Sequence, residues 1–301
     1  MAVSCQKFLD VNKNPNDPES VPESLQLSAL EGNFSYEILA NNAVRTTSLW
    51  TQQTAWNGVP PSDDNYDVKE NDVNNLWQYW SYTDVMNNAR KMDAQAIADG
   101  NFAYSAIAKT ILAWNLSVVT DLWNEVPYSK AFDPTNPTPE YDTQENVYKS
   151  IFTLLDDAIA NYGKSSSKTP GSDDLLYGGD LTKWQKLTYT LKARLLMHLT
   201  NAPGYTAATQ AQAALDALQN GFASNSDNAN FTYYDAQGSE NPWYQFAIDG
   251  KWDTRNQLSK TYVDLLTGLN DPRLPIQARP VGAVDGNGAV SGTITNPTYV
   301  G

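Results

Sequence analysis

The chain has 301 residues, of which 41% are hydrophobic and only 18% are charged, and its net charge is −14. This length fits one large domain or two ordinary ones, and 9 Trp, 17 Tyr and 8 Phe supply ample apolar area for a core. A negative field of this size repels phosphate backbones and bare anionic lipid, so we expect no nucleic-acid partner. The polar, aromatic and weakly charged composition instead favours neutral polyhydroxylated ligands.

Residues 1–20 form a polar segment rich in Asn and Pro that we interpret as a tether. It holds the single cysteine, Cys5, so no disulfide can form within the chain. Two readings of Cys5 remain open: an incidental thiol in a frayed terminus, or a lipoprotein acceptor whose lipid anchors a soluble domain to a membrane surface. No run of 18 or more apolar residues is present, so the sequence predicts no membrane-spanning helix.

Apolar residues recur at spacings of three and four along most of residues 21–222, a pattern that predicts a series of amphipathic helices. Asp72 and Asp180 are candidate N-caps, and Asp142 with Glu145 three residues later forms a capping box. Short or Pro-rich connections make consecutive helices antiparallel, as in an α-solenoid of helix pairs, although no clean 34-residue repeat is present. The predicted helices cover residues 22–53 (one helix or two), 72–99, 102–119, 142–162, 182–200 and 207–218.

A corner rich in aromatic residues is predicted at residues 121–132. Pro127 disfavours the α conformation for Val126, so the helix at 102–119 leads into an extended turn. Trp123, Tyr128 and Phe132 surround this turn, and each ring can bury roughly 150–250 Å². We therefore interpret the stretch as a packed structural corner. A further set of side chains is expected to pack inward from the helix at 72–99: Leu76, Trp77, Tyr79, Trp80, Val85 and Met86.

Residues 223–301 lack a sustained helical period and are predicted to be irregular and partly extended. Within them we expect a short strand at 231–234, a short helix at 258–266, and a stiff extended segment at 271–275, where two prolines flank Arg273 and Leu274. The predicted fold is therefore all-α, with a tether (1–20), a helical region (21–222) and an irregular region (223–301).

Few residues are available for catalysis or metal binding. The only histidine, His198, lies beside the buried stripe of a predicted helix, which favours a structural role. One histidine and one cysteine cannot form a metal cluster, and Pro15 breaks the calcium-loop pattern that begins at Asp10. Adjacent carboxylates are usually solvated or capping, yet they keep a glycoside hydrolase open as an alternative: Asp63/Asp64, Asp156/Asp157 and Asp173/Asp174. We expect no catalytic residue, no metal ion and no cofactor.

Aromatic residues in loops are the best indication of a ligand. Sugar rings present C–H faces that stack on Trp and Tyr, while Asn and Asp bind hydroxyl groups. The Gly/Pro/Asp-rich loop at 56–66 carries Trp56, Asn57 and Tyr66, and Trp252 lies in a later aromatic group with Trp243. We predict ligand binding at Trp56, Asn57, Tyr66 and Trp252; the alternative is that each of these side chains belongs to the core.

A set of motifs in this order resembles the SusD/RagB family, the surface nutrient-binding lipoproteins of Bacteroidetes. The element at 121–131 is similar to a characteristic element of that family, with Asn124 in place of its usual glycine. The other matching segments are Cys5 with Phe8-Leu9-Asp10-Val11-Asn12, Tyr141-Asp142-Thr143-Gln144-Glu145, Asp174-x-x-Tyr177-x-Gly179-Asp180-x-x-Lys183-Trp184, Leu191-Lys192-Ala193-Arg194-Leu195, Asn241-Pro242-Trp243-Tyr244 and Asp271-Pro272-Arg273-Leu274-Pro275.

The resemblance implies tetratricopeptide-like helix pairs beside an irregular region that is incomplete here, because chains of the family usually continue further. It implies a non-enzymatic protein, lipidated at Cys5, at the cell surface of the outer membrane. Such a protein captures glycans, or peptides in the RagB-like branch, and delivers them to a SusC-like TonB-dependent transporter. The ligand aromatics of the family lie in variable loops, so no binding residue is transferred by motif. A helical-repeat adaptor that binds only protein is a further alternative.

Overall fold

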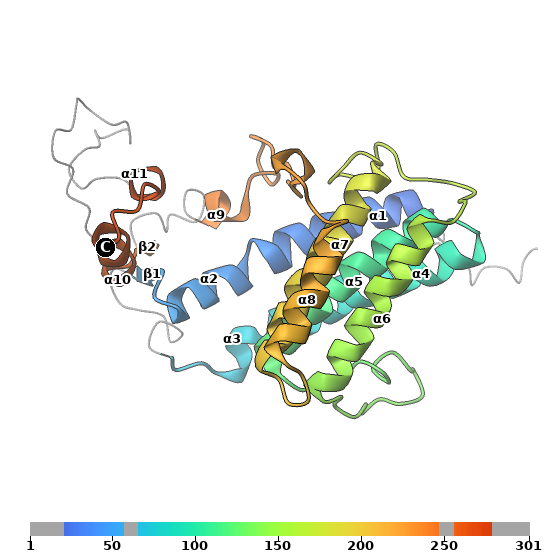
Figure 1. Ribbon diagram of the computed structural model, residues 1–301, viewed down its shortest axis with the longest axis horizontal. Helices are drawn as coiled ribbons and strands as arrows, with labels where there is room; N and C mark the ends of the chain where they lie inside the picture. The colour runs from blue at the N-terminus through green and yellow to red at the C-terminus, as the bar shows by residue number, and fades with distance from the viewer. Residues whose placement is uncertain (1–20, 57–65, 247–255, 279–301) are drawn as a thin grey trace, which may run out of the picture. The chain divides into compact units, whose positions relative to one another are not determined.

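The computed structural model describes residues 21–56, 66–246 and 256–278, which fall into two compact units (Figure 1). The described residues of unit 1 are 21–32 and 84–231. Those of unit 2 are 33–56, 66–83, 232–246 and 256–278. Each unit therefore combines two separate stretches of the chain. The domain boundaries predicted at residues 20 and 222 follow composition alone and stay a prediction.

Unit 1 is helical. Its helices are α1 (Glu23–Asn33, apart from the last residue), α4 (Asn88–Ala98), α5 (Phe102–Trp123), α6 (Gln144–Tyr162), α7 (Leu181–His198) and α8 (Ala207–Leu218), with short 3₁₀ turns η6 (Leu199–Asn201) and η7 (Asn225–Asp227). In Figure 1, α5 packs against α4 and α6, and α7 packs against α6 and α8. Consecutive helices joined by short connections form helix pairs, so the predicted all-α fold of tetratricopeptide-like pairs is confirmed.

The core of unit 1 is centred on α5. This helix is buried on almost every side, including Ile107, Leu112 and Leu116, as expected of a helix that is apolar all round. Alanines at 103, 106, 108 and 113 keep its surface narrow enough for its neighbours to approach closely. Among the described helices, α5 alone is long and apolar enough to cross a membrane by composition, but 83% of its most apolar window is buried within the protein. Its burial is that of a core helix.

Of the two N-caps predicted for α6 and α7, one is confirmed and one is wrong. Asp180 is the N-cap of α7 as predicted, and its carboxylate accepts hydrogen bonds from the backbone N–H groups of Thr182 (3.0 Å) and Lys183 (3.1 Å). The prediction that Asp142 caps α6 is wrong. The N-cap is Thr143, whose hydroxyl accepts a backbone N–H of the first turn. Both residue types suit this position, so sequence preference alone cannot choose between neighbours.

Asp142 instead closes the corner after α5. Its carboxylate accepts hydrogen bonds from the backbone N–H groups of Tyr128 (2.9 Å) and Ser129 (2.7 Å) and from the Ser129 hydroxyl (2.7 Å). Burial opposes ionisation of Asp142, but these hydrogen bonds outweigh it and lower its pKa. Its backbone also forms an antiparallel bridge with Val126. Val126 and Pro127 are buried, whereas Trp123, Tyr128 and Phe132 are half-buried, so the predicted packed corner is present.

The end of α5 contains a strained residue. The helix continues to Trp123, beyond the predicted end at residue 119, and Asn124 then adopts φ +66° and ψ −91°. This lies near the rare γ-turn conformation, which is unfavourable for residues with a side chain. Backbone hydrogen bonds hold it: Asn124 N donates to the Thr120 carbonyl (2.8 Å), and the Thr120 hydroxyl donates to the Asn124 carbonyl (2.6 Å).

We expect Asn124→Gly to raise the melting temperature by about 2 °C, because relief of roughly 1–3 kcal/mol of strain exceeds the added entropy of glycine in the unfolded chain. The backbone contacts with Thr120 remain available to glycine. Differential scanning calorimetry measures the change. Asn270→Gly is the control, since Asn270 has φ +49°, a left-handed value that asparagine tolerates. A lower melting temperature for Asn124→Gly than for the unmodified protein would contradict the assignment of strain.

Unit 2 is assembled from short elements. They are η3 (Phe34–Leu39), α2 (Asn42–Trp50), β1 (Thr54–Trp56), α3 (Glu70–Asn74), the first part of η5 (Asn75–Asn87), α9 (Pro242–Tyr244), β2 (Asn256–Leu258), α10 (Lys260–Gly268) and α11 (Leu274–Gln277). The two strands pair antiparallel and are the strands of the described residues. A small apolar cluster joins α10 and α11 through Val263, Leu266, Leu274 and Ala278.

Several predictions for unit 2 need correction. Residues 231–234 are not a strand. The segment at 271–275 is not extended either: residues 272–273 form a turn, and Pro275 lies within the first turn of α11, where a missing N–H costs nothing. The helix predicted at 258–266 is present as α10, displaced by two residues at each end. Asp72 is not an N-cap: it lies within α3 and accepts the backbone N–H of Lys69 (2.8 Å).

Candidate functional site

The residues predicted to bind ligand divide between described and undescribed parts of the chain. Asn57, Trp252 and the predicted lipidation residue Cys5 lie outside the described residues. Trp56 and Tyr66 are described, and both belong to unit 2. Of the predicted ligand-binding residues, the structure therefore describes these two aromatic side chains and their contacts.

Trp56 is held by the small β-sheet. It was predicted to lie in a loop, but it is the last residue of β1 and stands opposite Asn256 of β2. Ser259 fixes this pairing, because its hydroxyl donates to the Gln52 carbonyl and its backbone N–H donates to the Gln53 carbonyl (3.0 Å). The Trp56 side chain is half-buried. The side chain is therefore partly accessible to solvent.

Tyr66 combines an exposed ring with a fixed hydroxyl. Its hydroxyl donates to the carbonyl of Trp50, the last residue of α2, at 2.7 Å. The last carbonyls of a helix lack partners within the helix, so this bond fills a vacant acceptor. Even so, Tyr66 is 61% exposed. The arrangement presents an aromatic face to solvent without leaving the side chain free to rotate.

A second aromatic group in unit 2 gathers on the segment at 233–246. The Tyr36 hydroxyl donates to Gln245 Oε1 (2.7 Å), and the guanidinium group of Arg45 lies 4.1 Å from the centre of the Phe246 ring. Phe246 in turn meets Trp243 edge to face, with ring centres 6.5 Å apart. Neighbouring Tyr244 is 49% exposed. These contacts attach an aromatic segment to η3 and α2.

The sequence prediction missed a third aromatic group on η5. Tyr79 was expected to pack inward but is 51% exposed, and Trp77 and Trp80 are only half-buried, whereas Leu76 is buried as predicted. The reason is the π-helical winding of η5, whose i→i+5 hydrogen bonds change which side chains share a face. Trp77 and Tyr82, five residues apart, are accordingly ring neighbours at 5.0 Å. Aromatic residues at a spacing of five were the signal available in the sequence.

The adjacent carboxylates on which the glycoside hydrolase alternative depends have structural partners or are buried wherever they lie in the described residues. Asp156 pairs with Lys192, and Asp157 lies 4.0 Å from Lys109. Asp173 accepts a hydrogen bond from the Tyr104 hydroxyl at 2.8 Å, and Asp174 is 3% exposed. Asp63 and Asp64 lie outside the described residues. Within the described ranges, no group of three or more His, Cys, Asp or Glu could hold a metal ion.

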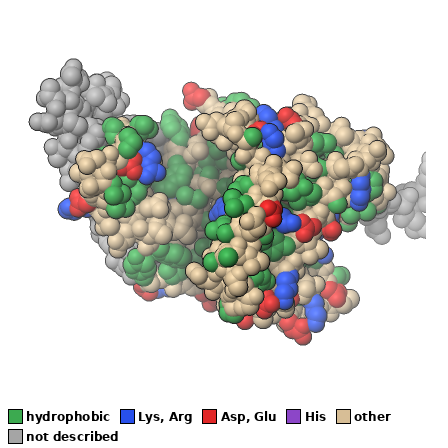
Figure 2. Space-filling model, viewed as in Figure 1, with side chains coloured by type: hydrophobic (Ala, Val, Ile, Leu, Met, Phe, Trp, Pro, Cys, Tyr) green, Lys and Arg blue, Asp and Glu red, His purple; other side chains and the backbone are tan. Residues whose placement is uncertain are grey.

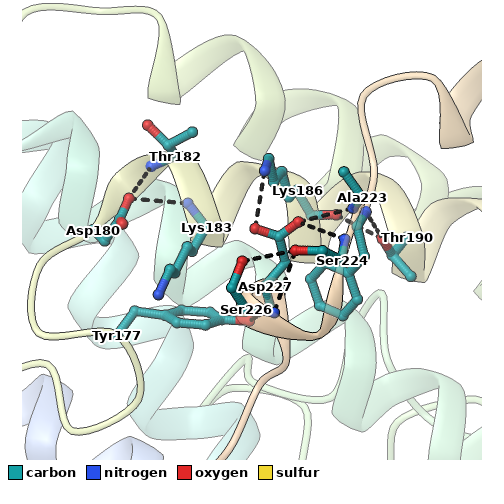
Figure 3. A network of polar contacts seen from close by, with 11 residues as sticks. Tyr177, Asp180, Thr182, Lys183, Lys186, Thr190, Ala223, Ser224, Ser226 and Asp227 are labelled. Atoms are coloured by element: carbon teal, nitrogen blue, oxygen red, sulfur yellow. Dashed lines mark hydrogen bonds and ion pairs between the residues drawn. The ribbon is translucent and has the colours of Figure 1, made fainter.

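Another carboxylate, Asp227, also serves the fold (Figure 3). It accepts hydrogen bonds from the backbone N–H groups of Ala223 (2.8 Å) and Ser224 (3.3 Å) and from Lys186 Nζ (2.9 Å), and the first of these is the main cause of its lowered pKa. The Tyr177 hydroxyl donates to its backbone carbonyl (2.9 Å). This network ties η7 to α7.

On the face shown in Figure 2, charged side chains are scattered among wide uncharged areas.

The comparisons with known proteins agree on one family. A family model described as starch-binding associating with outer membrane, SusD-like, matches residues 15–299. The chain belongs to the SusD-like family. The description names starch binding and association with the outer membrane as properties of the family. No curated protein matches the sequence.

Solved structures show the same fold. A SusD/RagB family protein from Bacteroides thetaiotaomicron is 28% identical, with a TM-score of 0.73 over 84% of this chain and 53% of that chain. A chitin-binding protein is 25% identical, with a TM-score of 0.72 over 92% of this chain and 60% of that chain. A SusD homolog from Bacteroides fragilis is 21% identical, with a TM-score of 0.69 over 89% of this chain and 55% of that chain. The chain thus spans 53% to 60% of the lengths of these relatives.

Proposed function

We propose that this protein captures oligosaccharides at the cell surface through the aromatic side chains of unit 2. The observation that carries the proposal is Tyr66, whose ring is exposed while its hydroxyl is held by the Trp50 carbonyl. A face fixed in this way binds a sugar ring without paying rotamer entropy on binding. Trp56, whose backbone is held by the β1–β2 pairing, is proposed as the second stacking residue.

The ligand class follows from chemistry and from relatives. Tyr and Trp present rigid aromatic faces with a polar edge, which suits sugars with apolar C–H faces and hydroxyl rims. The family is described as starch-binding, and one structural neighbour is a chitin-binding protein. We therefore propose neutral α- or β-linked glucosyl or N-acetylglucosaminyl oligosaccharides as first candidates. A peptide ligand of the RagB-like kind is the alternative within the same family.

The cellular role is proposed from the family. The protein would be anchored in the outer membrane through lipid on Cys5 and would pass its ligand to a SusC-like TonB-dependent transporter. Mass spectrometry of the protein from its native host would reveal a lipid on Cys5, and affinity purification from the same membranes would recover the transporter. An unmodified Cys5 would remove the lipid anchor from the proposal and leave the glycan site untouched.

Isothermal titration with starch- and chitin-derived oligosaccharides tests the glycan site. We expect Tyr66→Ala and Trp56→Ala each to weaken binding about tenfold, which corresponds to about 1.4 kcal/mol. Tyr66→Phe keeps the ring and removes only the hydroxyl, so a smaller loss is expected. Tyr141→Ala is the matched control, because Tyr141 is 62% exposed and belongs to unit 1.

Three outcomes would contradict this function. Binding of peptides but of no oligosaccharide would favour the RagB-like alternative. Release of shorter sugars during the titration would favour a glycoside hydrolase. Equal losses from Tyr141→Ala and Tyr66→Ala would remove the site from unit 2.

A further inference from the structure

A polar pocket of about 300 Å³ lies in unit 1, where the C-terminal ends of α5 and α7 meet the N-terminal end of α6. It is formed where the connection after α7 passes the first two turns of α6. This pocket is in the other unit from Trp56 and Tyr66, and the glycan site proposed above does not involve it. Its lining is Asp121, Gln144, Glu145, Tyr148, His198, Leu199, Ala202, Pro203 and Tyr205.

Three lining side chains form a hydrogen-bonded relay. The Tyr148 hydroxyl donates to Asp121 Oδ1 at 2.7 Å, and burial followed by this hydrogen bond raises the pKa of the phenol. Its oxygen can then accept a hydrogen bond from His198 Nδ1 at 2.8 Å. His198 Nδ1 also lies 3.3 Å from Asp121 Oδ2. In the tautomer that satisfies both contacts, Nδ1 carries a proton and Nε2 is the acceptor.

The other polar groups of the pocket also offer acceptors. Gln144 Nε2 donates to the Thr120 carbonyl at 3.0 Å, so the acceptor oxygen of this amide remains for a ligand. Glu145 pairs with Lys149 at 2.7 Å, but both side chains are about 60% exposed (59% and 62%), and such pairs are weak. The lining contains two carboxylates and neither Lys nor Arg. Apart from the Tyr205 hydroxyl and the backbone N–H groups at the start of α6, the lining offers acceptors, so it favours a ligand that brings hydrogen-bond donors.

The surrounding charge favours a cation among such donors. The C-terminal ends of α5 and α7 each add a partial negative charge, while the N-terminal end of α6 adds a positive one. Lys149 and Arg194 are the nearby cations: Lys149 is held by Glu145, and Arg194 acts on the Tyr148 hydroxyl from outside the lining. Tyr148 and Tyr205 add aromatic rings, whose faces attract cations.

We propose that this pocket binds a primary ammonium group, which supplies three N–H donors and a positive charge. The group could belong to an amino sugar or to an amino-acid amine. Glu145 is the ion-pair partner, His198 Nε2 and the Gln144 oxygen accept hydrogen bonds, and Tyr205 contributes its ring. The neutral, acetylated form of the same sugar lacks the charge and two of the three donors and is excluded.

Nuclear magnetic resonance titration of the full chain tests the pocket with glucosamine and L-lysinamide as probes and N-acetylglucosamine as the neutral counterpart. We expect saturable binding of at least one amine in the millimolar range and binding of N-acetylglucosamine at least tenfold weaker. Binding of glucosamine alone assigns an amino sugar, and binding of L-lysinamide alone assigns an amino-acid amine. Glu145→Gln and Tyr205→Ala should each weaken amine binding several-fold.

Glu140→Gln is the matched control, because Glu140 is also an exposed partner of a lysine (Lys130) in unit 1 but does not line the pocket. Tyr66→Ala must leave amine binding unchanged, which separates this site from the glycan site. Equal affinity for glucosamine and N-acetylglucosamine would overturn the proposal. An equal loss from Glu140→Gln and Glu145→Gln, or no saturable binding of either amine, would overturn it as well.

Discussion

Asp174→Ala is expected to lower the free energy of unfolding by about 4 kcal/mol or more, because it leaves several buried donors without an acceptor. Asp174 Oδ1 accepts the backbone N–H groups of Leu176 (3.0 Å) and Tyr177 (2.9 Å). Its Oδ2 accepts the N–H of Gly179 (2.8 Å) and the indole N–H of Trp184 (2.8 Å). One carboxylate thus shapes the turn before α7 and orients a tryptophan that is only 1% exposed.

Urea denaturation followed by tryptophan fluorescence measures this loss. Asp174→Asn keeps an acceptor for the turn but sets its NH₂ group against the donors of Gly179 and Trp184, so it should lose stability as well. Asp156→Ala is the control, since Asp156 is exposed and pairs with Lys192 at the surface. If Asp174→Ala were no less stable than Asp156→Ala, this carboxylate would not organise the turn.

Gly179 explains why the same turn tolerates no side chain. Its φ is +88°, and a Cβ atom there would lie 2.4 Å from the Pro170 carbonyl oxygen. Two independent features therefore require glycine at this position: its backbone conformation and the close approach of the segment at Pro170 and Gly171. Together with Asp174 and Trp184, it accounts for the spacing of the motif that the sequence contains at 174–184.

Glu31→Gln is expected to stabilise the protein at alkaline pH, on the order of 3 kcal/mol at pH 8, and to have little effect at pH 5. Glu31 is 4% exposed, and burial followed by the charge of Asp174 raises its pKa to about 9. Leu175 N–H donates to its Oε2 at 2.6 Å. Its Oε1 has no donor among the described residues, as fits a protonated carboxyl that instead donates to Asp174.

The direction of this pH effect follows from the number of protons that Glu31 binds in the folded and unfolded states. Between the ordinary value of 4.5 and about 9, unfolded Glu31 has lost its proton while folded Glu31 retains it. The contribution of Glu31 to the free energy of unfolding is therefore greatest below pH 4.5 and falls as pH rises toward 9, by up to about 1.4 kcal/mol per pH unit. Glutamine cannot titrate, keeps an acceptor for Leu175 N–H, and offers an NH₂ donor to Asp174, so its variant lacks this fall.

Urea denaturation of both proteins from pH 5 to pH 9 measures the difference. Glu140→Gln is the control for loss of one carboxyl group, because Glu140 is exposed beside Lys130. Parallel pH profiles for the unmodified protein and Glu31→Gln would show that Glu31 ionises normally in the folded state.

The aromatic residues show how far the sequence leads toward the candidate site. Loop composition at 56–66 predicted Trp56 and Tyr66 as ligand-binding residues, but it placed Trp56 in a loop rather than at the end of β1. The prediction for Tyr79 was wrong because the face that it occupies depends on π-helical winding, which the assumed spacing of three and four did not include. Whether these residues bind ligand stays a prediction for the titrations above.

Local features of the chain were determined by the sequence itself. Apolar spacing predicted the helices of unit 1, and Asp180 was identified as a cap, because both signals act within one or two turns of a helix. The motif at 174–184 belongs to the same class, since all of its hydrogen bonds to Asp174 lie within ten residues.

Only the tertiary structure decided which partners meet across long separations. Glu31 and Leu175 are 144 residues apart, and Tyr148 and His198 are 50 apart, yet these contacts determine a raised pKa and the form of a pocket. Asp142 likewise serves the corner at Tyr128 instead of its own helix. A local pattern lists the groups that need partners, but only packing decides which of the available partners comes within hydrogen-bonding distance.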